Sequence, residues 1–306
     1  MKSIAKKENK KPFDTTKAYK FLMKESTAGV LFSLPFILGF LFFILIPLLL
    51  SLYYSLCKYN VVGEAQFIGL KNYINIFSDE KFWKSLRVTV FYAVISVPLR
   101  VIFALLVAML LLKDTKLTPV YRAMYYLPSL LGSSVAVAIL WKQVFAYDGL
   151  INSIFGSKIV WLGDVKTAIW VIIALSVWQF GSSMLIFVAN LKQIPGSLYD
   201  AAKVDGGNSI QNFFHVTLPL ISPTIFFNFV MQSINGMMVF AAGQIITGGK
   251  PLDSTLFYAL YMYNQTFSYN NAGYGSALGW VLILIVAIYT GFLFLTKKFW
   301  VYEGGL

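Results

Sequence analysis

Long apolar runs without a charged side chain divide the sequence into segments. Five stretches contain no Asp, Glu, Lys or Arg: residues 26–57, 123–141, 167–191, 206–249 and 254–296. A helix needs about 20 mostly apolar residues to cross the hydrocarbon core of a bilayer, which is about 30 Å thick. The pattern therefore predicts an all-α integral membrane protein with six transmembrane helices. Their approximate ranges are 28–56, 86–112, 120–145, 166–190, 218–246 and 274–296.

Composition excludes an ordinary soluble domain. Hydrophobic residues make up 58% of the 306 residues, and charged residues only 12%, whereas soluble domains carry about 25% charged residues. The first apolar run is longer than the core of a cleaved signal peptide, and Leu56-Cys57-Lys58 offers no small-residue cleavage site. We expect this run to remain in the protein as a membrane anchor.

Basic residues concentrate on one side of the predicted membrane topology. The tail formed by residues 1–27 is rich in lysine. The same side holds further basic residues: Lys113, Lys116, Arg122, Lys192, Lys203, Lys297 and Lys298. Because cytoplasmic segments carry an excess of Lys and Arg, both termini, including the short tail 299–306, are predicted to be cytoplasmic. Two roles stay open for the basic tail: attraction to anionic membrane lipids, or the solvated, disordered segment that such a lysine-rich run more commonly forms.

Several kinds of chemistry are excluded by residue counts and motifs. Cys57 is the only cysteine and His215 the only histidine, so no disulfide, zinc cluster or imidazole-based triad is expected. Gly248-Gly249-Lys250 is followed by Pro251, which lacks the hydroxyl that an ATP-binding loop uses for magnesium. The basic residues do not form an exposed stripe interleaved with aromatics, which argues against a nucleic-acid partner. We expect no catalytic residue, no metal and no cofactor bound by this chain.

The predicted spans contain no acidic residue, and one basic residue lies deep within them. Proton- and sodium-coupled carriers usually keep a carboxylate inside the membrane, so its absence argues against self-powered transport. Arg100 follows Pro98 near the middle of the second span. Two interpretations stay open for Arg100: a packing role with bonds to backbone carbonyls, or a place on a hydrated path or subunit interface.

The segment 191–217 predicts two short helices on the cytoplasmic side. Ser197 and Asp200 form a capping-box pattern after Pro195, and Gly206-Gly207 would end the first helix. Asn208 and Gln211 repeat the pattern and start the second helix. The first helix carries an apolar face in a segment predicted to meet cytosol, which favours a protein partner.

Residues Leu198–Gly207, LYDAAKVDGG, followed by Thr217-Leu218-Pro219-Leu220, resemble the EAA loop of binding-protein-dependent ABC importer permeases. Flanking segments are similar to the carbohydrate branch of that family, in particular to its maltose-type first permease: Phe67–Tyr73, Tyr125–Pro128 and Ile246–Pro251. The likeness covers about residues 28–298, the expected permease domain. Asp200 stands where the family usually has Glu, and Gly207 where it usually has Ala.

The resemblance implies a type I ABC importer permease fold in the bacterial cell membrane. It also implies partners: a second homologous permease, two ATP-binding subunits that carry ATP and Mg, an extracellular solute-binding protein and a sugar substrate. In this family the loop 191–217 is the coupling loop, whose first helix docks on the ATPase. Carried over by position, the docking residues are Tyr199, Asp200, Ala201, Ala202, Asp205 and Gly206.

Sugar recognition needs polar groups for hydroxyls and aromatic faces for C–H surfaces. The fourth and fifth spans offer such residues, and the family holds its sugar with side chains from these regions. The expected substrate path comprises Trp178, Gln179, Ser182, Gln232, Asn235 and Gly236. Helix packing is the alternative role for each of them. For the whole chain, the alternatives are a secondary transporter or channel for a small polar solute, and a membrane scaffold or signalling subunit.

Overall fold

The computed structural model describes residues 25–132 and 134–302. The chain forms two compact units, which are divided after Tyr53. In the described part, regular structure is helical except for the antiparallel strands β1 (Cys57–Lys58) and β2 (Gln66–Phe67), paired with Cys57 opposite Phe67. The prediction of an all-α protein is therefore confirmed in its essentials.

The first unit contains one apolar helical stretch. Its elements are α2 (Glu25–Phe40), the π-helical segment η1 (Leu41–Leu45) and α3 (Ile46–Ser55), which runs just beyond the boundary. Side chains on all sides of it are apolar and exposed, among them Phe32, Phe36 and Phe43. A helix that is apolar all round fits a lipid environment, and Gly29–Ser55 is long and apolar enough to cross a membrane.

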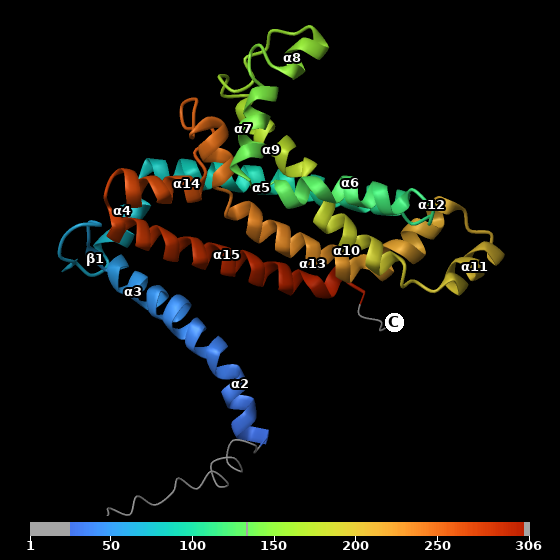
Figure 1. Ribbon diagram of the computed structural model, residues 1–306, viewed down its shortest axis with the longest axis horizontal. Helices are drawn as coiled ribbons and strands as arrows, with labels where there is room; N and C mark the ends of the chain where they lie inside the picture. Colours follow the sequence, from blue (N-terminus) through green and yellow to red (C-terminus); the bar gives the residue numbers. More distant parts are fainter. Residues whose placement is uncertain (1–24, 133, 303–306) are drawn as a thin grey trace, which may run out of the picture. The chain divides into compact units, whose positions relative to one another are not determined.

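The second unit is a helical bundle around α5 (Glu80–Leu110), which packs on α9 (Ala168–Trp178), α10 (Gly181–Leu191), α13 (Leu218–Met237) and α14 (Tyr258–Tyr263). In Figure 1, α13 runs beside α15 (Ala272–Trp300). The remaining helical elements are α4 (Lys71–Phe77), α6 (Thr118–Leu131), α7 (Val135–Val144), α8 (Leu150–Phe155), α11 (Gly196–Val204), α12 (Ser209–Asn212), η2 (Phe213–Thr217), η3 (Gly243–Thr247) and η4 (Asn264–Ser268).

Membrane-spanning capacity agrees with the expected number of spans. Five described helical stretches are long and apolar enough to cross a bilayer, and the bent pair α6 and α7 would make a sixth. The expected span 120–145 is not one straight helix, because α6 and α7 meet at 101°. Ser134 starts α7 by accepting a hydrogen bond from the Val137 amide, and Gly132 lies against the Gln179 side chain.

The fifth expected span, 218–246, is displaced in the structure. Helical structure begins at Ser209 and continues through η2 into α13, which ends at Met237. Pro219 has no amide hydrogen to donate to the preceding turn. The helix nevertheless continues past it, because the π turn η2 comes directly before α13. Gly243–Thr247 instead forms the separate element η3, where Gly243 approaches the Phe257 ring so closely that a side chain would overlap it.

Candidate functional site: a polar cavity and an exposed loop helix

The fourth span is broken between α9 and α10, and α6 crosses over the break. Ser129 of α6 donates a hydrogen bond from its hydroxyl to the Gln179 carbonyl (2.8 Å) and accepts one from the Ser182 amide (3.0 Å). Gly181 allows this close crossing, because a Cβ there would lie 2.7 Å from the Tyr126 Cα atom. The break therefore brings backbone polar groups of Gln179 to the inside of the bundle.

A cavity of about 460 Å³ lies beside this break. Three helices supply its polar lining: α5 with Tyr92, Ser96 and Arg100, the end of α9 with Ser176 and Gln179, and α13 with Gln232 and Asn235. The three α5 residues are spaced four apart, so they share one helix face. Phe240 and several aliphatic side chains complete the wall.

Arg100 is partly exposed and lines the cavity. Its Nη2 atom donates a hydrogen bond to the Gln179 carbonyl (2.6 Å). Its Nε atom is buried without a hydrogen-bond partner in the described part of the chain. The structure is consistent with both a packing role and a place on a hydrated path for Arg100, because its side chain bonds to a backbone carbonyl and also lines the cavity.

Four of the six expected substrate-path residues line the cavity: Gln179, Gln232, Asn235 and Gly236. Gln232 also donates to the Ser183 hydroxyl (3.0 Å), and Gln179 donates from its side chain to the Gly132 carbonyl (3.1 Å). These two amides consequently serve helix packing as well.

Trp178 and Ser182 are absent from the lining. The Trp178 ring stacks on Trp141 of α7, with ring centroids 5.5 Å apart. Sequence reasoning did not include Tyr92, Ser96 or Ser176 in the path. The four-residue spacing of Tyr92, Ser96 and Arg100 within an apolar helix is a signal that could have identified Tyr92 and Ser96, but it does not extend to Ser176 of α9.

The loop helix α11 ends in a turn that requires Gly206. The Gly206 backbone has φ +80°, a left-handed conformation that side chains disfavour. The Gly206 amide donates to the Lys203 carbonyl and the Gly207 amide donates to the Ala202 carbonyl, which is the Schellman pattern of helix ends. Gly207 is required for space, because a Cβ there would lie 2.8 Å from the Ala202 oxygen.

The two capping predictions in this loop have different outcomes. Asn208 and Gln211 form the expected capping box, with bonds of 2.8 and 2.9 Å. The Ser197–Asp200 box is wrong, because α11 starts at Gly196 with Pro195 as its N-cap and without a side-chain cap. Asp200 instead pairs with Lys203 at 3.1 Å.

The expected docking residues differ in their exposure to solvent. Asp200, Ala201, Asp205 and Gly206 are exposed, and Ala202 is half-buried. Tyr199 is half-buried against the bundle, and its hydroxyl lies 3.0 Å from the Thr217 hydroxyl. Val204, which was not in the expected set, is 88% exposed, and Ile210 of α12 is 70% exposed. Exposed apolar side chains of this size favour a protein contact.

Comparison with known proteins assigns the chain to a family. Residues 77–297 match the family described as "Binding-protein-dependent transport system inner membrane component". The chain belongs to this family. The permease is 46% identical over 297 residues to "Probable ABC transporter permease protein YesP" of Bacillus subtilis (strain 168), covering 94% of this chain and 96% of that one. It is 35% identical over 273 residues to "Lactose transport system permease protein LacF" of Rhizobium radiobacter, covering 85% and 90%.

The fold of the permease is also known from a solved structure. A chain of the "bacterial ABC transporter involved in the import of the acidic polysaccharide alginate" superposes with a TM-score of 0.79 at 19% identity, covering 92% of this chain and 98% of that chain. The protein is therefore a non-catalytic, multi-pass inner-membrane subunit of a binding-protein-dependent ABC importer. ATP is bound by the separate ATPase subunits of such importers.

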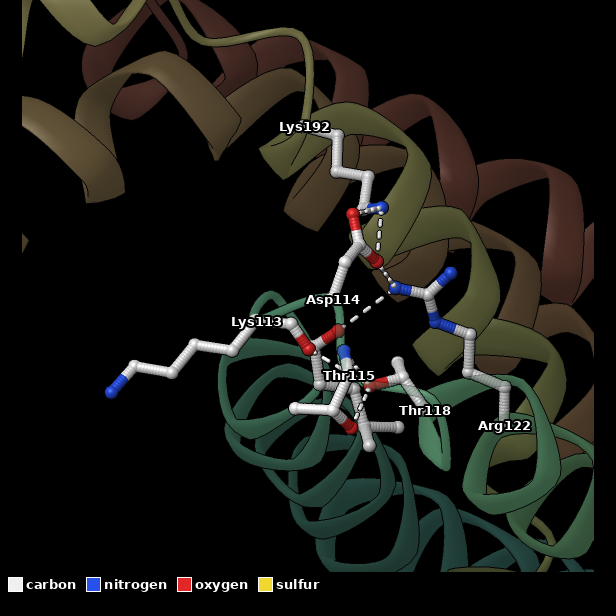
Figure 2. A network of polar contacts seen from close by, with 7 residues as sticks. Lys113, Asp114, Thr115, Thr118, Arg122 and Lys192 are labelled. Atoms are coloured by element: carbon white, nitrogen blue, oxygen red, sulfur yellow. Dashed lines mark hydrogen bonds and ion pairs between the residues drawn. The ribbon is translucent and has the colours of Figure 1, made fainter.

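An ion-pair cluster joins the start of the loop 191–217 to the turn between α5 and α6. Figure 2 shows the Asp114 carboxylate between Lys192 and Arg122. The Lys192 Nζ atom lies 2.7 Å from Asp114 and the Arg122 Nη2 atom lies 3.2 Å from it. The hydrogen bond from Lys192, followed by the charges of Lys192 and Arg122, lowers the pKa of Asp114. Because Asp114 is exposed, solvent screens these charges and the cluster contributes little to stability.

A second polar cluster lies at the start of α5. Asp79 caps this helix, since it accepts hydrogen bonds from the amides of Lys81 and Phe82. The hydroxyls of Tyr261 and Tyr274 also donate to Asp79. Burial raises the pKa of Asp79, but these hydrogen bonds outweigh it and hold the pKa below its ordinary value. Asp79 thus links α14 and α15 to the N-terminal end of α5.

Proposed function

We propose that the permease imports a sugar or oligosaccharide that an extracellular binding protein delivers, with a second homologous permease beside it. The observation that carries this proposal is the cavity of about 460 Å³ beside the broken fourth span. Its volume lies within the usual range for ligand pockets, about 300–1,000 Å³. The similarity to LacF, which is described as a lactose permease, supports a sugar as the substrate class.

The chemistry of the lining fits a sugar. Asn235 and Gln232 offer amide groups, Ser96 and Ser176 offer hydroxyls, and the rings of Tyr92 and Phe240 offer apolar faces. Sugars present hydroxyls around a ring whose C–H surfaces pack on aromatic side chains. A site of this mixed character can hold a neutral hydroxyl-rich molecule in an otherwise apolar bundle.

Energy would enter through the helix α11 on the cytoplasmic side. In this proposal the docking surface comprises Asp200, Ala201, Ala202, Asp205 and Gly206, with Val204 added to it. Tyr199 positions the helix from behind, through its contact with Thr217. The proposal keeps both termini in the cytoplasm, as the distribution of Lys and Arg indicates.

Asn235→Leu tests the substrate path. Asn235 is exposed and lines the cavity, so leucine of similar size would remove the amide with little effect on packing. Sugar uptake by the complete importer in proteoliposomes should fall about tenfold, the equivalent of one lost hydrogen bond of about 1 kcal/mol or slightly more. ATPase activity should stay near that of the unchanged importer.

Asn190→Leu is the matched control. Asn190 is a half-buried asparagine on a spanning helix; within the described part of the chain its side chain donates to the Ile186 carbonyl, four residues before it, and it lies outside the cavity lining. Sugar uptake should be unaffected in this variant. Equal uptake by the Asn235 and Asn190 variants would contradict the proposed path.

A further inference from the structure

The cavity has a single charged side chain, Arg100, among its described lining residues. A neutral sugar needs hydroxyl and amide partners, which the other lining residues already supply. A permanent positive charge is costly to hold in a bundle surrounded by lipid unless another group offsets it. The presence of Arg100 at this place therefore needs a separate explanation.

The guanidinium of Arg100 is only partly satisfied within the chain. Arginine has five N–H donors, and one hydrogen bond is made, from Nη2 to the Gln179 carbonyl. The Nε atom is buried with no partner in the described residues. A carbonyl offers a dipole and no charge, so the positive charge of Arg100 is left without a counter-charge at this contact.

No carboxylate of the described spans can supply that counter-charge. Within the candidate spans, including α6 and α7, the only acidic residue is Glu80, the first residue of α5. At a rise of about 1.5 Å per residue, the twenty positions from Glu80 to Arg100 separate them by about 30 Å along the helix. The anion must come from outside the described chain.

We propose that Arg100 binds a carboxylate of the cargo, so that the importer takes acidic, uronate-bearing oligosaccharides in preference to neutral ones. This inference rests on the proposed function in sugar import. The planar guanidinium matches a carboxylate with two parallel hydrogen bonds, which lysine cannot reproduce. The amides of Gln232 and Asn235 then remain for hydroxyls of the same sugar, and the Gln179 carbonyl holds the guanidinium at the cavity wall.

The test offers the complete importer a mixture and identifies what it accumulates. Proteoliposomes that contain the permease, its partner permease, the ATPase and the binding protein receive equal concentrations of neutral malto-, arabino- and galacto-oligosaccharides and of oligosaccharides that bear galacturonate, glucuronate or mannuronate. Mass spectrometry then identifies the accumulated sugars. The unchanged importer should accumulate uronate-bearing species.

Three variants separate charge from structure. Arg100→Gln keeps a polar amide donor but has no charge, and it should lower acidic uptake by about 10- to 100-fold, as expected for a lost bond to a charged group. Arg100→Lys keeps the positive charge but cannot make two parallel hydrogen bonds to a carboxylate, and it should give an intermediate rate of acidic-sugar uptake. Arg87→Gln is the matched control, since Arg87 is exposed on the same helix and lies outside the cavity lining, and it should import at the unchanged rate.

Three results would overturn the assignment of Arg100. Accumulation of neutral species alone by the unchanged importer would do so, as would undiminished acidic uptake by Arg100→Gln. Separation of the two permeases on purification of Arg100→Gln would mean that Arg100 pairs with a carboxylate of the partner subunit. Accumulation of no sugar by the unchanged importer would contradict the proposed function as well, and this outcome is distinct from the other three.

Discussion

Val204→Ser is expected to uncouple the permease from its ATPase without unfolding it. The Val204 side chain is 88% exposed at the end of α11, so the permease itself should lose less than about 0.5 kcal/mol of stability. Valine and serine also have similar helix propensities. If Val204 is covered on docking, loss of this apolar contact should cost about 1.5–3 kcal/mol. That corresponds to roughly a 10- to 150-fold weaker association.

The assay measures two quantities on the same preparation. Binding of the purified ATPase to the permease in nanodiscs gives the association constant, and uptake into proteoliposomes gives the coupled rate. Val62→Ser is the matched control, because Val62 is 84% exposed and lies between β1 and β2, outside the loop. Normal binding and uptake by Val204→Ser, or equal losses in both variants, would refute the reasoning.

Three further predictions concern coupling, packing and pH. Ala202→Arg adds a bulky charge to the half-buried side of α11, so ATP-driven uptake should fall at least tenfold; persistence of both uptake and ATPase association would disprove docking at α11. Gly181→Ala should lower stability by about 1–3 kcal/mol, seen as a lower melting temperature, whereas Gly291→Ala, with open space around it, should change it little. The depressed pKa of Asp79 contributes stability above the unfolded pKa of about 4, and this stability is lost as pH falls through the folded pKa. Asp79→Asn should therefore weaken the dependence of the melting temperature on pH between pH 7 and 3. An unchanged pH dependence would contradict the role of Asp79.

Local signals in the sequence were sufficient to predict much of the structure of the loop 191–217. The Asn208–Gln211 box and the Gly206 turn depend on residues within five positions of one another, so the local sequence contains all that forms them. The Ser197–Asp200 box failed because Pro195 takes the N-cap position, so the helix begins at Gly196, two residues earlier than a Ser197 cap requires. The run of apolar residues predicted the number of spans for the same reason, since each span is defined by its own composition.

Features that depend on distant residues could not be predicted. The bend between α6 and α7 is accompanied by the approach of Gly132 to Gln179, which lies in another span. Trp178 looked like a sugar-facing ring, but its stacking on Trp141 depends on how α7 packs on α9. The cavity itself combines residues of α5, α9 and α13, and only their helical spacing within each span is visible in the sequence.

ATP dependence of sugar uptake tests the central claim most directly. The measurement compares proteoliposomes that hold the complete importer with samples in which ATP, the ATPase or the binding protein is omitted in turn, and with this chain alone under a proton gradient. The account predicts sugar accumulation only when ATP, the ATPase and the binding protein are all present. Accumulation driven by the proton gradient through this chain alone would contradict it.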